Sequence, residues 1–285
     1  MVITPKKMYS LACEWLKDND IENAEFDASQ LFEKAFGFKE SSPKAEEMSD
    51  SSYFHELVTA RSWGWPLQYL LGEWEFYGIP LKVGQGVLIP RQDTETLVET
   101  VICKNRNVDP VIIDLCSGSG CIALALEHEL KAGDIYAVEK SEAAAQYLKE
   151  NIALNNSEVK AVVGDCLDKG IIQSLPKADI IVCNPPYLTS EDMKNLQREV
   201  TYEPEEALFG GEDGLDFYRD ITRSYKTRLC HNGMLAFEVG YTQAEEVMEI
   251  LIQAGFEDVR AYEDYCGVKR VVIGFYTEKG NVKVY

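Results

Sequence analysis

Four consecutive residues, Asn184-Pro185-Pro186-Tyr187, are suited by type and spacing to holding a planar NH₂ group for reaction. The two prolines fix φ and leave the backbone nearly rigid, so the Asn184 side-chain oxygen and the Pro185 carbonyl are prepositioned acceptors. Two acceptors in one plane suit the two N–H donors of a planar NH₂ group. Tyr187 can stack on the flat face of that group.

A planar NH₂ nitrogen is a poor nucleophile because its lone pair is delocalised. Hydrogen bonds to both of its protons hold the nitrogen in line with an electrophilic methyl group, and they stabilise the positive charge that develops. Hydride transfer has no evident use for two such acceptors. The segment therefore favours methyl transfer, and a proline-rich turn without a chemical role is the alternative.

A glycine-containing turn at residues 114–120 is suited to a nucleoside cofactor. Glycines let a backbone turn sharply and approach a ligand without Cβ clashes. Glu139 follows Gly120 by about 20 residues, a spacing at which an acid can accept both ribose hydroxyls. A packing turn is the alternative, and the motif alone does not choose between NAD and S-adenosylmethionine. The turn consists of Asp114, Leu115, Cys116, Ser117, Gly118, Ser119 and Gly120.

Two further positions leave alternatives open. Asp165 and Cys166 end a third apolar run, where they could meet an adenine ring, or Asp165 could simply cap the following turn. Arg91 could meet a substrate backbone or pair with Asp93.

The elements that must position these residues follow from hydrophobic patterning. From residue 111 onward, short apolar runs alternate with helical segments, which predicts an open α/β sheet covered on both faces. The last two strands are expected to be antiparallel, because too few residues separate them for a helical crossover. Ligands of such sheets bind outside the carboxyl ends of the strands. The seven predicted strands are 111–115, 135–139, 159–165, 179–184, 234–239, 259–264 and 270–276. The predicted helices in this part are 94–104, capped by Thr94, and 119–131, 142–155, 214–229 and 242–254.

The first 70 residues or so have a helical pattern. Ser10 is expected to cap the first helix, Gly37 to end a second helical segment, and residues 51–62 to form a third helix. Residues 74–90 contain short runs separated by glycines, which predicts a β-hairpin between two domains. The predicted divisions are a helical domain at 1–72, a hairpin linker at 73–92 and an α/β domain at 93–285.

The combination of these motifs resembles known families. The glycine turn, Glu139 and the Asn-Pro-Pro-Tyr segment resemble the class I S-adenosylmethionine-dependent methyltransferases that act on planar nitrogen. Two sets of further segments narrow the resemblance to the release-factor glutamine methyltransferases, the PrmC/HemK family: 76–78 and 88–95 around the start of this domain, and 202–204, 207–211 and 213–216 after Tyr187. The likeness covers about residue 60 to the end of the chain, and more loosely the helical N-terminus.

The resemblance implies a Rossmann-like, seven-stranded class I methyltransferase sheet with a small N-terminal helical domain. It also implies N5-methylation of the glutamine in the Gly-Gly-Gln loop of bacterial class I peptide chain release factors, with S-adenosylmethionine converted to S-adenosylhomocysteine. The implied catalytic residues are Asn184, Pro185, Pro186 and Tyr187, and the implied substrate-binding residues are Asn184, Pro185, Tyr187 and Arg91. The implied cofactor-binding residues are Asp114, Cys116, Ser117, Gly118, Ser119, Gly120, Glu139, Asp165, Cys166 and Asn184. The helical domain would help to grip the release factor.

Three positions depart from the family pattern. Cys116 begins the turn where the family usually has glycine, although a small residue still fits there. Gln92 replaces a common proline, which weakens the rigidity of its loop slightly. Cys166 replaces a bulky aromatic residue, so stacking on adenine would be weaker.

Composition excludes several other functions. The chain has 285 residues, with 28 Lys and Arg against 48 Asp and Glu, a net charge of -20. Such a charge disfavours nucleic acid and anionic membranes as partners. We find no spacing typical of a metal site, no signal peptide and no hydrolase triad, and the scattered cysteines fit a reducing cytoplasm. A monomer is expected. The alternatives are a ribosomal-protein glutamine methyltransferase, a DNA adenine-N6 methyltransferase and a non-catalytic scaffold.

Overall fold

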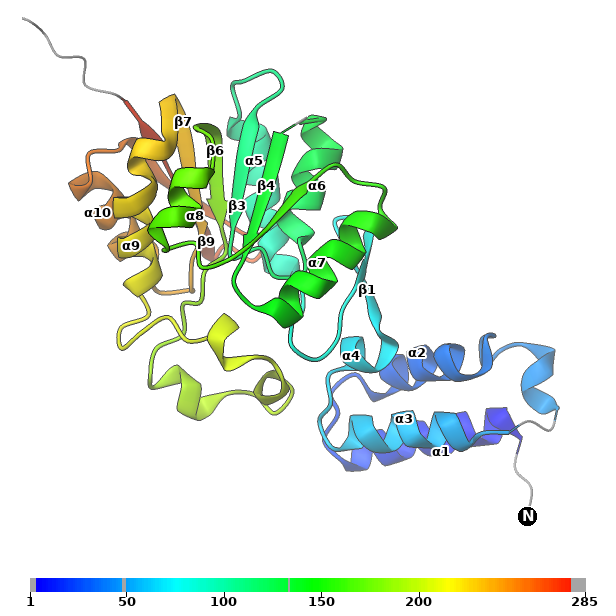
Figure 1. Cartoon of the computed structure of the whole chain (residues 1–285). Coiled ribbons are helices and arrows are strands. Elements are labelled where there is room, and N and C mark those ends of the chain that lie inside the picture. The colour runs from blue at the N-terminus through cyan, green and yellow to red at the C-terminus, as the bar shows by residue number, and fades with distance from the viewer. Residues whose placement is uncertain (1–3, 48–49, 133, 278–285) are drawn as a thin grey trace, which may run out of the picture. The chain divides into compact units, whose positions relative to one another are not determined.

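The computed structural model describes residues 4–47, 50–132 and 134–277 (Figure 1). The predicted ranges that begin at residue 1 or end at residue 285 therefore reach beyond the described residues. The chain forms two compact units. One comprises Met1–Trp74, Val83–Gln85 and Gln197–Glu203, and the other comprises Glu75–Lys82, Gly86–Leu196 and Pro204–Tyr285. Among the described residues, no helix is long and apolar enough to cross a bilayer.

The first unit is helical. Thr4, not the predicted Ser10, caps its first helix, and the Thr4 side chain accepts a hydrogen bond from the Lys7 backbone N–H. Pro5 occupies the first turn, where its fixed φ favours a helix start, so Ser10 falls inside the helix and donates to the Lys6 carbonyl. The helices are α1 (Pro5–Asp18), α2 (Ala24–Phe36), α3 (Ser52–Ser62) and α4 (Leu67–Leu71). Gly37 ends α2 with a φ of 72°, as predicted.

A buried ion cluster ties the segment 197–203 to these helices. Arg61 donates from Nε to Asp27 Oδ2 at 2.6 Å and from Nη2 to Glu199 Oε1 at 3.0 Å. The Arg61 side chain is only 9% exposed and that of Asp27 6%. In the same unit, the Trp65 and Tyr202 rings lie 5.2 Å apart. Two segments far apart in the sequence therefore form one folded unit.

The predicted hairpin is present but short. β1 (Glu73–Phe76) and β2 (Ile79–Lys82) pair in a two-stranded sheet. Tyr77 and Gly78 join them with φ values of 52° and 73°, the positive values that a two-residue hairpin turn requires. Residues 86–90 belong to neither strand.

The second unit contains the predicted seven-stranded sheet, with strand order β5-β4-β3-β6-β7-β9-β8. All neighbouring pairs from β5 to β7 are parallel, and β9 pairs antiparallel with β7 and β8. The strands are β3 (Val111–Leu115), β4 (Asp134–Glu139), β5 (Lys160–Val163), β6 (Ala178–Cys183), β7 (Leu229–Glu238), β8 (Glu257–Glu263) and β9 (Lys269–Tyr276). The predicted fold class, α/β with an open, mostly parallel seven-stranded sheet, is therefore confirmed.

Helices cover both faces of this sheet (Figure 1). α9 and α10 pack against each other, and their buried faces join one large core cluster with the central strands. On the other side α5 packs against α6, and α7 packs against β4 and β5. The helices are α5 (Glu95–Lys104), α6 (Cys121–Leu130), α7 (Glu142–Leu154), α8 (Lys169–Ser174), α9 (Asp216–Tyr225) and α10 (Ala244–Gln253).

The strand order creates a switch point. The chain runs outward from β3 to β4 and β5, and then returns to place β6 on the other side of β3. The loops after β3 and β6 consequently leave the sheet side by side and in opposite directions, which opens a crevice at the carboxyl edge. The glycine turn follows β3 and Asn184 follows β6, so the fold brings the two predicted motifs to the same crevice.

Candidate active site

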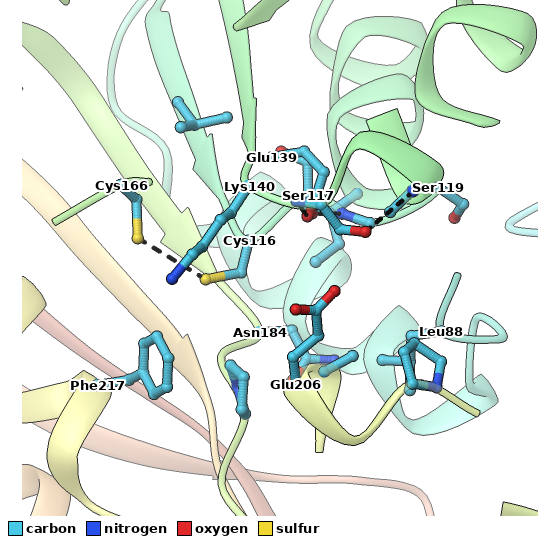
Figure 2. A pocket seen from close by; sticks show the side chains of 18 of the residues that line it. Leu88, Cys116, Ser117, Ser119, Glu139, Lys140, Cys166, Asn184, Glu206 and Phe217 are labelled. Atoms are coloured by element: carbon cyan, nitrogen blue, oxygen red, sulfur yellow. Dashed lines mark hydrogen bonds between the residues drawn. The ribbon is translucent and has the colours of Figure 1, made fainter. Parts of the chain in front are cut away.

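A pocket of about 710 Å³ lies at the carboxyl ends of the parallel strands. The sequence-predicted residues in its lining are Arg91, Cys116, Ser117, Gly118, Ser119, Glu139, Asp165, Cys166, Asn184 and Pro186. Four other predicted residues, Asp114, Gly120, Pro185 and Tyr187, are not part of the lining. Figure 2 shows the glycine turn and Glu139 on one side of this pocket and Asn184 on another.

The glycine turn has the backbone conformation that its sequence requires. Cys116, Gly118 and Gly120 have φ values of 57°, 55° and 84°. A Cβ atom on Gly120 would lie 2.5 Å from Leu148 Cδ1 of α7, so a larger residue would force that side chain to shift, and the positive φ itself favours glycine. Gly120 therefore shapes the turn from behind, while Gly118 faces the pocket.

Glu139 is held by backbone donors at the end of β4. Its Oε2 accepts from the Gly118 N–H and its Oε1 from the Ser141 N–H, both at 2.7 Å. Burial raises the pKa of Glu139, and these backbone hydrogen bonds oppose the rise. Each carboxylate oxygen has a second lone pair, so Glu139 can still accept from a ligand in the pocket.

Asp114 lies beneath the turn. Its side chain is fully buried and neither carboxyl oxygen makes a hydrogen bond of good geometry, although the Ser117 side chain and the Ala123 backbone lie near enough to favour its charged form. Burial raises the pKa of Asp114 to about 8. The sequence motif places Asp114 with the cofactor residues, whereas in the fold it supports the turn from inside the protein.

Asp165 and Cys166 line the pocket beyond the end of β5. Asp165 Oδ1 accepts from the Leu167 N–H at 2.8 Å, so Asp165 does cap the following turn, which was one of its two predicted roles. Its Oδ2 pairs with Lys140 Nζ at 3.0 Å. Cys166 Sγ lies 4.0 Å from Cys116 Sγ (Figure 2). Hydrogen bonding with Cys116 and burial raise the pKa of Cys166, so its thiol stays protonated.

The Asn-Pro-Pro-Tyr segment leaves β6 at the crevice. Asn184 Nδ2 donates to Thr94 Oγ1 at 3.3 Å. The Tyr187 carbonyl accepts from Gln243 Nε2 at 3.0 Å, which fixes the far end of the segment. Burial raises the pKa of Tyr187, so its phenol is neutral.

The predicted role of Thr94 as a helix cap is wrong. Its side chain makes no capping hydrogen bond, and its φ and ψ values are already helical. The Thr94 side chain is only 2% exposed and is directed to the interior, where it contacts Asn184. Long-range hydrogen bonding thus outweighs the local capping preference.

Five pocket or supporting residues were not predicted: Lys140, Glu206, Phe217, Gln243 and Glu238. Figure 2 shows the Glu206 carboxylate pointing into the pocket and the Phe217 ring on the Cys166 side. The acidic run at 203–206 was the available signal for Glu206. Phe217 carried no signal, because nothing in the spacing of α9 marks the face toward the pocket.

Glu238 is the last residue of β7 and is 1% exposed. Burial raises the pKa of Glu238 to about 7, while hydrogen bonds from the Thr94 and Asn184 side chains and the charge of Arg270 oppose the rise. Arg270 Nη2 in turn pairs with Asp93 Oδ2 at 2.9 Å.

Comparison with known proteins gives matches along most of the chain. The family described as Methyltransferase small domain matches residues 92–212, and the PrmC N-terminal domain matches residues 8–72. A release factor glutamine methyltransferase of Thermodesulfovibrio yellowstonii is 44% identical over 216 residues, which cover 73% of this chain and 75% of the relative. One of Geobacter sulfurreducens is 35% identical over 277 residues, covering 95% of this chain and 96% of the relative. A methyltransferase of Pyrococcus furiosus, at 20% identity, has a TM-score of 0.55 over 71% of this chain and 91% of its own, and supports the fold.

Proposed function

We propose that this chain, which belongs to the family of release factor glutamine methyltransferases, methylates N5 of the glutamine in the Gly-Gly-Gln loop of class I peptide chain release factors. These relatives confirm the family that the sequence predicts. The chain is an enzyme of the protein-glutamine methyltransferase type, and S-adenosylmethionine is the proposed cofactor.

The observation that carries the proposal is the shared pocket of Asn184 and the Gly118–Glu139 pair. One side of the pocket offers an amide oxygen beside a rigid Pro-Pro segment, which suits a planar NH₂ group. The other side offers a carboxylate held by two backbone N–H groups, which suits a ribose.

The lining also fits the charge and shape of the proposed cofactor. When bound, S-adenosylmethionine supplies a methyl group on a positively charged sulfur. The pocket contains four carboxylates, at Glu139, Asp165, Glu205 and Glu206, and two basic side chains, at Lys140 and Arg91. Its apolar walls provide a surface for a flat base; they include Ile122, Val138, Leu167 and Phe217.

The chain's own residues have simple proposed roles. Asn184 Oδ1 and the Pro185 carbonyl accept the two N–H donors of the substrate glutamine and hold its nitrogen in place. Tyr187 does not line the pocket; it packs against the core behind the Asn-Pro-Pro segment and supports it from there, and Arg91, in the lining, binds the substrate.

We further propose how the protein meets its substrate. The helical residues 1–72 help to grip the release factor, with 73–92 as a linker and 93–285 as the catalytic domain. The net charge of -20 suits a basic protein surface and disfavours DNA. On this basis we propose that it has no nucleic acid or membrane partner; we also propose that it is a monomer and, from its scattered cysteines, that it acts in the cytoplasm. Association rates with a release factor should fall as salt is added.

The test is incubation of the purified protein with methyl-labelled cofactor and a purified release factor. Label on the glutamine of the Gly-Gly-Gln loop, located by peptide mass spectrometry, supports the proposal. A release factor with Asn in place of that glutamine is the matched control. Label that appears on a ribosomal protein or on DNA adenine in preference to the release factor would refute it.

A further inference from the structure

We propose that Glu238 is a positioning residue which, together with Thr94, fixes the side-chain amide of Asn184 so that its oxygen faces the substrate glutamine. This inference rests on the proposed function, since it assigns a support to the residue that would hold the substrate. Glu238 does not line the pocket and is not assigned contact with substrate.

Strand register places the two side chains together. Cys183 at the end of β6 is paired in parallel with Phe237 of β7. The next residue on each strand, Asn184 and Glu238, therefore leaves the sheet at the same edge and on neighbouring strands. Thr94, 2% exposed, approaches the pair from the segment before α5.

Hydrogen bonding determines which way the Asn184 amide points. The oxygen and nitrogen ends of an amide are nearly equal in shape, so their neighbours decide the orientation. Burial raises the pKa of Glu238 to about 7, and the Thr94 and Asn184 side chains oppose that rise, so above about pH 7 the group is a carboxylate that only accepts. Its Oε2 has no hydrogen-bond partner among the described residues, which leaves Oε1 for both side chains. Asn184 therefore presents its NH₂ end to Glu238.

Thr94 reinforces the same orientation. A hydroxyl group has one proton, and the ionised carboxylate of Glu238, whose pKa Thr94 helps to lower, is the acceptor for it. The Thr94 oxygen can then only accept, and it does so from Asn184 Nδ2 at 3.3 Å. With its NH₂ end engaged on both sides, Asn184 leaves its oxygen for one N–H donor of the glutamine, and the Pro185 carbonyl is left for the other.

The protonation of Glu238 should matter for this arrangement. A protonated carboxyl group becomes a donor, which allows the Asn184 amide to turn and present its NH₂ end to the substrate, where donor would face donor. The groups that interact electrostatically with Glu238 are Asp93, Cys121, Cys183, Tyr187, Tyr218 and Arg270. Burial raises the pKa of Cys121 to about 12 and that of Cys183 to about 11, so these thiols do not titrate near neutral pH.

The first experiment measures kcat, the KM for the release factor and the dissociation constant of the cofactor for Glu238→Ala, Glu238→Gln and Thr94→Val. Glu238→Ala should lower kcat by about 100-fold, because the amide loses its orientation. Its cofactor dissociation constant should stay within about threefold of wild type. Glu238→Gln keeps an acceptor oxygen and should recover most of the loss at pH 8.

Two comparisons separate positioning from general structural damage. Thr222→Val removes another buried hydroxyl, 1% exposed and without a hydrogen-bond partner among the described residues, and should leave kcat unchanged. Wild-type kcat should fall as the pH drops below about 7, and this acid limb should be absent from Glu238→Gln. The Glu238→Ala and Thr94→Val effects should be far from additive, because both act through one amide.

Different outcomes would contradict the positioning role of Glu238 and the proposed methyltransferase function. If the wild-type protein labels a release factor while Glu238→Ala and Thr94→Val keep full kcat, the positioning role is wrong and the proposed function stands. An acid limb that persists unchanged in Glu238→Gln also contradicts it, even if Glu238→Ala cannot be obtained folded. If the wild-type protein labels no glutamine, both proposals fail.

Discussion

Glu139 Oε2 accepts a 2.7 Å hydrogen bond from the backbone N–H of Gly118, which joins the end of β4 to the turn after β3. Because Ser141 N–H holds the other oxygen at the same distance, the carboxylate cannot rotate away from the pocket without losing both bonds. The acid is thus oriented before any ligand arrives, which reduces the entropy cost of binding.

Replacement of Glu139 by alanine should weaken cofactor binding. Each charge-assisted hydrogen bond lost to a ribose hydroxyl should cost about 1.5–3 kcal/mol. Isothermal titration calorimetry with S-adenosylhomocysteine measures the change, and Glu139→Gln should also lose affinity, because its NH₂ end would face one of the two backbone N–H donors. Unchanged affinity in Glu139→Ala would show that this acid does not bind the ribose.

Replacement of Asn184 by alanine should abolish methyl transfer and largely spare cofactor binding. The variant loses the acceptor that orients the substrate nitrogen, a loss that should lower kcat by about 100-fold or more. Labelled-methyl assays and calorimetry on the same sample check both halves of the prediction. Equal losses of activity and cofactor affinity would instead assign Asn184 to cofactor binding.

Replacement of Phe217 by alanine should weaken cofactor binding through its base. Stacking of a base on an aromatic ring contributes about 1–3 kcal/mol, and Phe217 lines the pocket on the side of Cys166. Adenosine and S-adenosylmethionine should lose affinity to the same extent, since the affected contact is with the shared base. A loss seen with S-adenosylmethionine alone would place Phe217 against its methionine part.

Asp114 should make stability depend on pH. Its carboxyl has a pKa raised from 3.8 to about 8 by burial, so the folded state binds this proton more tightly than the unfolded state. The proton's stabilising contribution is full below about pH 4 and is lost as the pH rises toward 8, at about 1.4 kcal/mol per unit of pKa shift. Thermal unfolding from pH 5 to 9 should show wild type losing stability relative to Asp114→Asn, which does not titrate. Parallel curves would contradict the buried titration.

Replacement of Arg61 by alanine should destabilise the helical unit. The change leaves Asp27 buried without its partner, and breaking one side of a buried ion pair costs about 3–5 kcal/mol. Hydrogen exchange of α2 and α3 measures the local loss. Arg219→Ala is a suitable control, since its pair with Asp213 is exposed and worth under about 1 kcal/mol. Similar effects of the two variants would count against the cluster's importance.

The sequence was sufficient to predict the sheet and the meeting of the two motifs. Apolar runs of strand length located all seven strands, because a strand that is buried on both faces consists almost entirely of apolar residues. The strand-turn-helix context of Gly118 and Gly120 then placed the turn at the carboxyl edge, next to Asn184. Local signals determine these features, so one sequence was enough.

The support behind the site could not be predicted in the same way. Thr94 and Glu238 are separated from Asn184 by long stretches of chain, and only the strand register brings them together. Ser10 and Thr94 both failed as caps, because Pro5 starts α1 earlier and Asn184 engages the Thr94 hydroxyl. Asp114 shares a motif with residues of the pocket but points into the core.

The return of residues 197–203 to the helical unit has a consequence for protein engineering. One of the two carboxylates that Arg61 contacts, that of Glu199, lies only about a dozen positions after the Asn-Pro-Pro-Tyr segment. Consider a chimera in which residues 1–74 come from a relative and the rest from this chain. Its residue 61 would then come from one protein and Glu199, the partner of Arg61, from the other. To transfer the helical unit intact, a designer must also exchange residues 197–203, so that Arg61, Asp27 and Glu199 all come from the same protein.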